Sequence, residues 1–337
     1  MGCSTSRSEG NCVSSSEQEG NASVVVSRLP FVADSAYAYI DRQVAFGARV
    51  PGTESHRRCG DWLVSELLRH GAEVSEQKGE MVNYAGAQQP IRNIVGCVEG
   101  TTPGTVLLCA HWDCRPWSDE ERAYEHRFDP VMGANDGASG VGVILEIVRQ
   151  WSLLKQEAQY NDALPGLQIV FFDCEDMGTP THYTGKEREH TWCLGSQLWA
   201  REYQSAMQAR RLPHKIRYGI LLDMVGDPTA RFPRDYCSMQ YAGAYVEQLW
   251  ATARRLGYGT YFVTNNTQNG AYCTIIDDHY YVNTIAGIPC LDIIDYNPHS
   301  QTGFKPWWHT RSDDMRNINK QTLKAVGETV ITSLCSK

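Results

Sequence analysis

The stretch Phe171-Phe172-Asp173-Cys174-Glu175-Asp176 decides the predicted fold, because a short apolar strand there runs directly into adjacent carboxylates. Residues 167–172 are mostly apolar or aromatic, follow a Pro-Gly pair and end at acids, which is typical of a buried strand. In an open α/β sheet, ligands bind outside the carboxyl ends of the strands. Glu175 and Asp176 are therefore predicted at such an end, although an isolated Glu-Asp pair is more often a solvated acidic turn.

The composition favours a globular protein over a nucleic-acid-binding or membrane-spanning one. The 337 residues would allow two domains, but no composition break marks a linker, so one α/β catalytic domain is predicted over 28–337. The hydrophobic content of 42% is enough for a large core. A net charge of -8 argues against nucleic acid as the main partner, and no apolar run is long enough to form a transmembrane segment.

Residues 1–27 are rich in Ser, Gly, Glu and Asn, so they are predicted to form a disordered leader or tether. The opening Met1-Gly2-Cys3-Ser4-Thr5-Ser6 matches a loose myristoylation pattern, and it also resembles a mature bacterial lipoprotein whose export signal has been removed. An ordinary chain start is the third interpretation. We favour a lipid anchor at Cys3, and hence a periplasmic or membrane-anchored protein. With Cys3 lipidated, eleven cysteines remain and at least one is unpaired; the sequence fixes no disulfide.

Periodicity and turn signals predict alternating strands and helices along the rest of the chain. The predicted strands are 72–77, 91–98, 105–110, 167–172, 216–222 and 289–294, and the predicted helices are 36–46, 56–69, 138–151, 245–256, 281–286 and 320–334. Ser55 is the predicted N-cap of the second helix. The pattern predicts a mixed, mostly parallel central sheet flanked by helices on both faces, entered through antiparallel strands.

Residue types that bind metals recur after several predicted strands or in unusual loops. They are His111 with Asp113 after a strand, Asp136 in a Gly-flanked turn before a helix, Asp223 at a strand end, and His309 in an aromatic loop. Each alone has an ordinary explanation, such as a satisfied histidine or a helix N-cap. Together with Glu175 and Asp176, these carboxylates and imidazoles are typical of a catalytic zinc site, which leaves a coordination position open.

The local sequences around these residues resemble those of a known superfamily. The matching motifs are Ala-Asn-Asp136-Gly-Ala-Ser-Gly, Phe-Phe-Asp-Cys-Glu175-Asp176, Leu-Leu-Asp223 and Trp308-His309-Thr310. In this order they resemble the zinc-dependent aminopeptidases and, within them, the animal-type glutaminyl cyclases and their bacterial relatives, over about residues 30–337. The resemblance implies a zinc-exopeptidase-like fold. It also implies that Asp136, Asp176 and His309 hold one zinc ion and that Glu175 is the general acid/base.

Two subfamilies must be separated, because His111 and Asp223 stand where two-zinc aminopeptidases place ligands for a second ion. In glutaminyl cyclases, the residue matching Asp223 belongs to a proton-handling network instead. Asp277-Asp278-His279 resembles a cyclase segment whose first acid supports catalysis, and the stretch 222–228 is also similar to the cyclases. The resemblance therefore favours Glu175, Asp223 and Asp277 as the catalytic acids.

The aromatic residues near His309 resemble the wall of the cyclase pocket. Trp308 precedes His309 and Phe304 lies four residues before Trp308; without the histidine, ordinary core filling would explain both. Trp192 is the expected third aromatic residue, although an insertion over 177–191 separates it from the acids. A further departure is Glu175-Asp176 itself, where animal cyclases carry Glu-Glu.

The expected activity is conversion of N-terminal glutamine of peptides or proteins to pyroglutamate, with release of ammonia. The alternatives are a two-zinc aminopeptidase and a binding module that kept the fold without catalysis.

Overall fold

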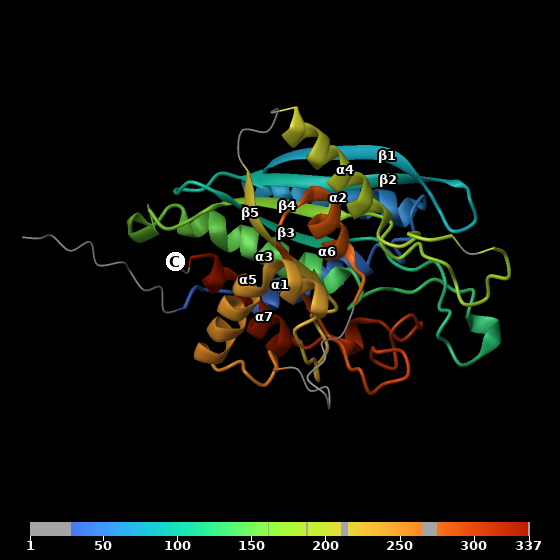
Figure 1. The fold of residues 1–337 in the computed structure, drawn as a ribbon. Helices are drawn as coiled ribbons and strands as arrows, with labels where there is room; N and C mark the ends of the chain where they lie inside the picture. Colours follow the sequence, from blue (N-terminus) through green and yellow to red (C-terminus); the bar gives the residue numbers. More distant parts are fainter. Residues whose placement is uncertain (1–27, 161, 187, 210–214, 265–274, 336–337) are drawn as a thin grey trace, which may run out of the picture.

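The computed structural model describes residues 28–160, 162–186, 188–209, 215–264 and 275–335. Within these ranges the chain builds a six-stranded sheet in the spatial order β1-β2-β4-β3-β5-β6, with helices on both faces (Figure 1). The strands are β1 (Glu73–Val82), β2 (Gln88–Val98), β3 (Thr105–His111), β4 (Gly166–Phe172), β5 (Ile216–Asp223) and β6 (Cys290–Ile294). The predicted leader, including Cys3, lies outside the described residues, so the tether and the lipid anchor stay predictions.

The sheet is mixed and mostly parallel, as predicted. Strands β4, β3, β5 and β6 run parallel, whereas β1 pairs antiparallel with β2 and β2 antiparallel with β4. His111 at the end of β3 lies in register with Phe172 at the end of β4, and Asp223 ends β5 on the other side of β3. The residues that follow three neighbouring strands therefore meet at one edge of the sheet.

Helices cover both faces of the sheet (Figure 1). One face carries α1 (Ala33–Val44), α2 (Glu54–Arg69), α3 (Ala138–Leu154), α5 (Tyr236–Arg255) and α7 (Lys320–Leu334), which share a large apolar core with the strands. The other face carries α4 (Leu194–Gln208), α6 (Asp278–Tyr281) and the π-helical turn η3 (Val282–Ala286). Short 3-10 turns are η1 (Tyr124–His126), η2 (Ala158–Tyr160) and η4 (Met315–Asn317).

The structure differs from the predicted elements in places where local signals are weak. Helix α4 was not predicted, because it begins after Cys193, which is in the left-handed region and makes no side-chain cap. Helix α5 begins at Tyr236 rather than at 245, since Asp235 caps it and a kink at Ala242 interrupts its periodicity. The cap of α2 is Thr53, whose side chain accepts a hydrogen bond from the His56 amide, rather than the predicted Ser55.

Helix α3 packs so closely on the sheet that Gly140 is expected to tolerate no side chain. A Cβ there would overlap the carbonyl oxygen of Leu222 on β5, and backbone cannot move aside without disturbing the sheet. We expect Gly140→Ala to lower the free energy of unfolding by about 3 kcal/mol, measured by denaturant titration. Gly243→Ala in α5 is the matched control, because a Cβ there would lie 3.8 Å from the Met239 methyl carbon, an ordinary van der Waals contact. An equal loss of unfolding free energy in both variants would contradict the close contact between Gly140 and β5.

Candidate metal and catalytic site

A cavity of about 490 Å³ opens at the carboxyl ends of the parallel strands. Nine of the predicted site residues line this cavity: Asp136, Glu175, Asp176, Trp192, Asp223, Asp277, Phe304, Trp308 and His309. His111 is not among the lining residues but contacts Asp136. The residues come from loops after β3, β4, β5 and β6 and from the start of α6. The fold therefore brings together all of the predicted site residues, and the roles assigned to them stay predictions.

Asp136, Asp176 and His309 form a compact, buried group of ligand-type atoms. The Nε2 atom of His309 lies 3.0 Å from Asp176 Oδ1 and 3.5 Å from Asp136 Oδ2, and one ligand atom from each residue lies within 4.8 Å of the others. The second oxygen of Asp176 and Oδ2 of Asp136 are buried without a hydrogen-bond partner. Unpaired buried carboxylate oxygens are costly unless a cation or a proton is present.

This group fits a zinc ion. Burial raises the pKa of Asp136 well above its usual range, and repulsion from the Asp176 carboxylate raises it further. A bound cation would offset the free-energy cost of ionising Asp136 in this place. Burial lowers the pKa of His309, which favours the neutral imidazole that metal binding requires. Two carboxylates and one imidazole, with the cavity on the open side, are a donor set found in catalytic zinc sites.

A second group shares Asp136 with the first. The Nε2 atom of His111 lies 2.9 Å from Asp136 Oδ1 and 3.2 Å from Asp223 Oδ1. One ligand atom from each of these three residues lies within 4.8 Å of the other two. Asp136 thus faces His309 with one oxygen and His111 with the other. The arrangement has the ligand types of a two-metal site with a bridging carboxylate.

Two further carboxylates hold the loops that carry the ligands. Asp113 accepts hydrogen bonds from the backbone amides of Glu175 at 3.2 Å and Asp176 at 3.3 Å. Asp313 accepts from the amides of Asn135 at 2.8 Å and Asp136 at 3.0 Å. The sequence marked Asp113 only as an acid near His111, because which amides Asp113 and Asp313 bind depends on the assembled loops.

The backbone around the cavity adopts unusual conformations. Cys174, Cys193, Met224 and His309 are non-glycine residues with φ between 49° and 55°. Each lies next to or at a site residue, at the turns that follow β4 and β5 or in the loop before η4. Left-handed conformations of non-glycine residues cost roughly 1 kcal/mol or more, and they persist where surrounding contacts determine the backbone.

Arg115 and Asp119 were missed by the sequence interpretation and connect three site residues. The Arg115 guanidinium forms two 2.7 Å hydrogen bonds with the Asp119 carboxylate and donates to the Asp176 carbonyl at 3.0 Å. It also stacks 4.6 Å from the centre of the Trp192 ring. The Oδ1 atom of Asp119 lies 3.7 Å from Nδ1 of His309. The Asp119 carboxylate also accepts a hydrogen bond from the backbone amide of Thr181, which lies in the insertion over 177–191. No motif marks this pair, since its partners are distant in the sequence.

Asp119→Asn is expected to weaken zinc binding about 10- to 100-fold, because a carboxylate behind a ligand histidine orients its ring and raises its basicity. The measurement is competition for zinc with a chromophoric chelator. Asp129→Asn is the matched control, since Asp129 lies in the same loop but its carboxylate pairs with His126 and Arg311 at the surface. Equal zinc affinities of the two variants would show that Asp119 does not support His309.

Glu175 and Asp277 form an acidic pair in the cavity, with one carboxylate oxygen of each within 4.8 Å of the other. Burial raises the pKa of Glu175 well above its usual range, and the carboxylates of Asp176 and Asp277 raise it further against the opposing effect of His111. Burial and the neighbouring Asp223 raise the pKa of Asp277 to about 7. A carboxyl group with a pKa near 7, such as that of Asp277, can exchange protons near neutral pH.

Aromatic rings form the walls next to His309. The Trp308 ring stacks on the His309 imidazole with centroids 3.5 Å apart, and Phe304 packs on Trp308 at 4.5 Å. The Trp192 ring is nearly parallel to the imidazole, with centroids 6.1 Å apart and an interplanar angle of 6°. The cavity therefore combines an apolar wall with a dense group of acids, as expected of a site for a small organic substrate.

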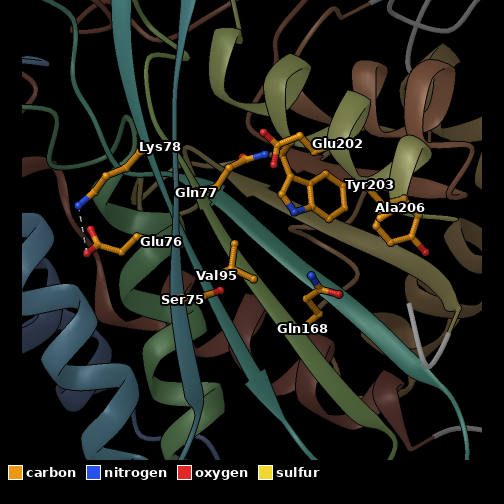
Figure 2. A pocket seen from close by; sticks show the side chains of 10 residues that line it. Ser75, Glu76, Gln77, Lys78, Val95, Gln168, Glu202, Tyr203 and Ala206 are labelled. Atoms are coloured by element: carbon orange, nitrogen blue, oxygen red, sulfur yellow. Dashed lines mark ion pairs between the residues drawn. The ribbon is translucent and has the colours of Figure 1, made fainter. Parts of the chain in front are cut away.

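A separate hollow of about 470 Å³ lies between β1, β2, β4 and α4 (Figure 2). Figure 2 shows Gln77, Gln168 and Tyr203 around it, with the Glu76–Lys78 ion pair at its side. None of the predicted site residues lines it.

Two further predictions can be compared with the described residues. Every described cysteine carries a free thiol, and Cys97 on β2 is exposed. Among the described helices, none combines the length and the apolar character that crossing a bilayer requires.

Comparisons with known proteins agree with this geometry. The model of peptidase family M28 matches residues 93–334. The glutaminyl cyclase of Tannerella forsythia is 47% identical in structure-based comparison, covers 91% of this chain and 99% of its own, and superposes with a TM-score of 0.80. A Zn-dependent exopeptidase of Parabacteroides distasonis ATCC 8503 is 44% identical, covers 92% and 100%, and has a TM-score of 0.81.

Sequence comparison with curated proteins leads to the same superfamily. Aminopeptidase YwaD of Bacillus subtilis (strain 168) is 24% identical over 286 residues, which cover 83% of this chain and 52% of that protein. The chain spans about half the length of the curated relatives it matches. The resemblance to bacterial glutaminyl cyclases within the zinc aminopeptidase superfamily is confirmed: the chain belongs to peptidase family M28, a family of zinc-dependent enzymes.

Proposed function

We propose that this protein is a zinc-dependent glutaminyl-peptide cyclotransferase, which converts N-terminal glutamine of peptides or proteins to pyroglutamate and ammonia. The observation that carries the proposal is the combination of Trp192, Phe304 and Trp308 beside the Asp136–Asp176–His309 group, in one cavity with Glu175. The similarity to bacterial glutaminyl cyclases supports the same function.

The residues suit this reaction. A zinc ion held by Asp136, Asp176 and His309 would supply Lewis-acid polarisation of the substrate's side-chain amide. Glu175 would take a proton from the substrate's α-amine, whose nitrogen forms a bond to the amide carbon, and would return the proton to the departing ammonia. Asp277 lies within 4.8 Å of Glu175 and would share this proton, since its pKa of about 7 allows both protonation states.

The aromatic walls of the cavity would orient the substrate. Cyclisation needs the glutamine side chain folded back on its own amine, and holding reacting atoms in this arrangement can provide much of the rate enhancement. Phe304 packs on Trp308, and the rings of Trp308 and Trp192 both lie nearly parallel to the His309 imidazole. These flat apolar surfaces would exclude extended conformations of the glutamine side chain and would keep water away from it.

A Gln-initiated dipeptide tests the proposal directly. The expected products are a pyroglutamyl amino acid and one ammonia per turnover. Release of two free amino acids would overturn the proposal and select the aminopeptidase.

The second candidate function is a two-zinc aminopeptidase, and a specific observation favours it. His111 and Asp223 share Asp136 with the first group, as ligands of a second ion would. With two ions, Glu175 would accept a proton from the attacking water instead of from an amine. This candidate requires a zinc content near two per chain, whereas the cyclotransferase proposal expects one.

A further inference from the structure

The thiol of Cys193 faces the proposed acid/base from within the protein. Its Sγ atom donates a hydrogen bond to Glu175 Oε1 at 3.2 Å, and its backbone amide donates to the Glu175 carbonyl at 2.9 Å. Cys193 is fully buried, and its left-handed backbone, with φ of 55°, directly precedes helix α4. Hydrogen bonds from its thiol and from its backbone amide to Glu175 therefore fix the position of Cys193.

Asp277 completes a group of three ligand-type side chains. One ligand atom each of Glu175, Cys193 and Asp277 lies within 4.8 Å of the other two. Asp277 is only 4% exposed, and its Oδ2 atom has no hydrogen-bond partner. These residues come from the loop after β4, the start of α4 and the start of α6, so the fold rather than one local turn brings them together.

This group shares no residue with the Asp136–Asp176–His309 group and has different chemistry. A thiolate with two carboxylates suits a thiophilic divalent cation, whereas two carboxylates and an imidazole are an ordinary zinc donor set. Zinc–sulfur and zinc–oxygen bonds of about 2.3 and 2.0 Å place tetrahedral ligand atoms roughly 3.3–3.8 Å apart. The Glu175–Cys193 separation of 3.2 Å is already close to this spacing.

A cation can reach the group, and its charge would be favourable there. Glu175 and Asp277 both line the 490 Å³ cavity, and the buried Cys193 thiol lies 3.2 Å from Glu175 Oε1. The two carboxylates repel one another in a desolvated place, so a divalent ion that displaces the thiol proton would replace repulsion with attraction.

We propose that Glu175, Cys193 and Asp277 form a second, inhibitory site for a thiophilic divalent cation, such as Cd²⁺ or Zn²⁺ in excess. The inhibitory part rests on the proposed function, since a cation bound to Glu175 removes its carboxylate from proton transfer. Binding itself does not depend on which reaction the enzyme catalyses.

The test is a cadmium titration of the zinc-loaded protein, with the sulfur-to-cadmium charge-transfer absorption as the signal. The wild type is expected to gain one such band per chain while its zinc content stays constant, and ammonia release falls in parallel. Cys193→Ser is expected to lose the band and to require at least about tenfold more cadmium for inhibition, because soft cations prefer thiolate to hydroxyl ligands. The rate of ammonia release by each variant in cadmium is expressed as a fraction of the rate of the same variant without cadmium.

Cys174→Ser is the matched control. Cys174 is also fully buried and directly precedes Glu175, but its thiol points to the Pro90 carbonyl at 3.5 Å. It is expected to keep both the band and the inhibition. An unchanged band in Cys193→Ser, or loss of zinc in step with cadmium uptake, would overturn the site. A protein that gains the Cys193-dependent band but does not cyclise glutamine overturns the proposed function and leaves the cation site intact.

Discussion

Glu175→Gln is expected to reduce ammonia release from a Gln-initiated peptide roughly 10²- to 10⁴-fold, the range of general acid–base contributions. The amide keeps the size of the side chain but cannot accept the amine proton. Glu175 lies outside the Asp136–Asp176–His309 group, so the variant should keep its zinc. Steady-state ammonia release and zinc content of the same preparation are the two measurements.

Glu189→Gln is the matched control for this variant. Glu189 lines the same cavity but is exposed, and the substitution removes the same charge. We expect its rate to stay close to that of the wild type. Turnover retained by Glu175→Gln would refute the assignment of the general base. A rate lost together with zinc would instead show that Glu175 supports the metal.

The sequence was most informative where local pattern and sheet topology act together. An apolar run that ends in acids predicts a strand end, and parallel strands place their carboxyl ends at one edge. His111, Phe172 and Asp223 accordingly lie at the ends of adjacent strands. The convergence of the acids and histidines could be predicted because it needs only the order of the strands.

What could not be predicted depends on contacts between loops. Arg115 and Asp119 carry no signal by themselves, and their role follows from meeting Asp176, Trp192 and His309 in the folded protein. Helix α4 lacks a capping side chain because its start is determined by hydrogen bonds to the loop after β4. Tertiary contacts thus replace local signals around the site, as expected where backbone strain is held by surrounding structure.

His309 and His111 provide the sharpest test of the metal assignment, because both are buried imidazoles that contact Asp136. In the proposed one-zinc enzyme, His309→Gln should weaken zinc binding at least about 100-fold, more than loss of a residue behind a ligand. Activity should fall with the zinc content. His111→Gln should still hold one zinc per chain, since the His111–Asp136–Asp223 group is then a hydrogen-bonded support rather than an ion site.

The two histidine variants also separate the competing functions. Zinc is measured per chain after dialysis, and activity is followed as zinc is returned to chelator-treated wild type. Full recovery with one equivalent agrees with the cyclotransferase proposal. A requirement for two equivalents, with one ion lost from His111→Gln, would mean that Asp136 bridges two metals. The enzyme would then activate water between two ions, and peptide hydrolysis would replace cyclisation as its expected reaction.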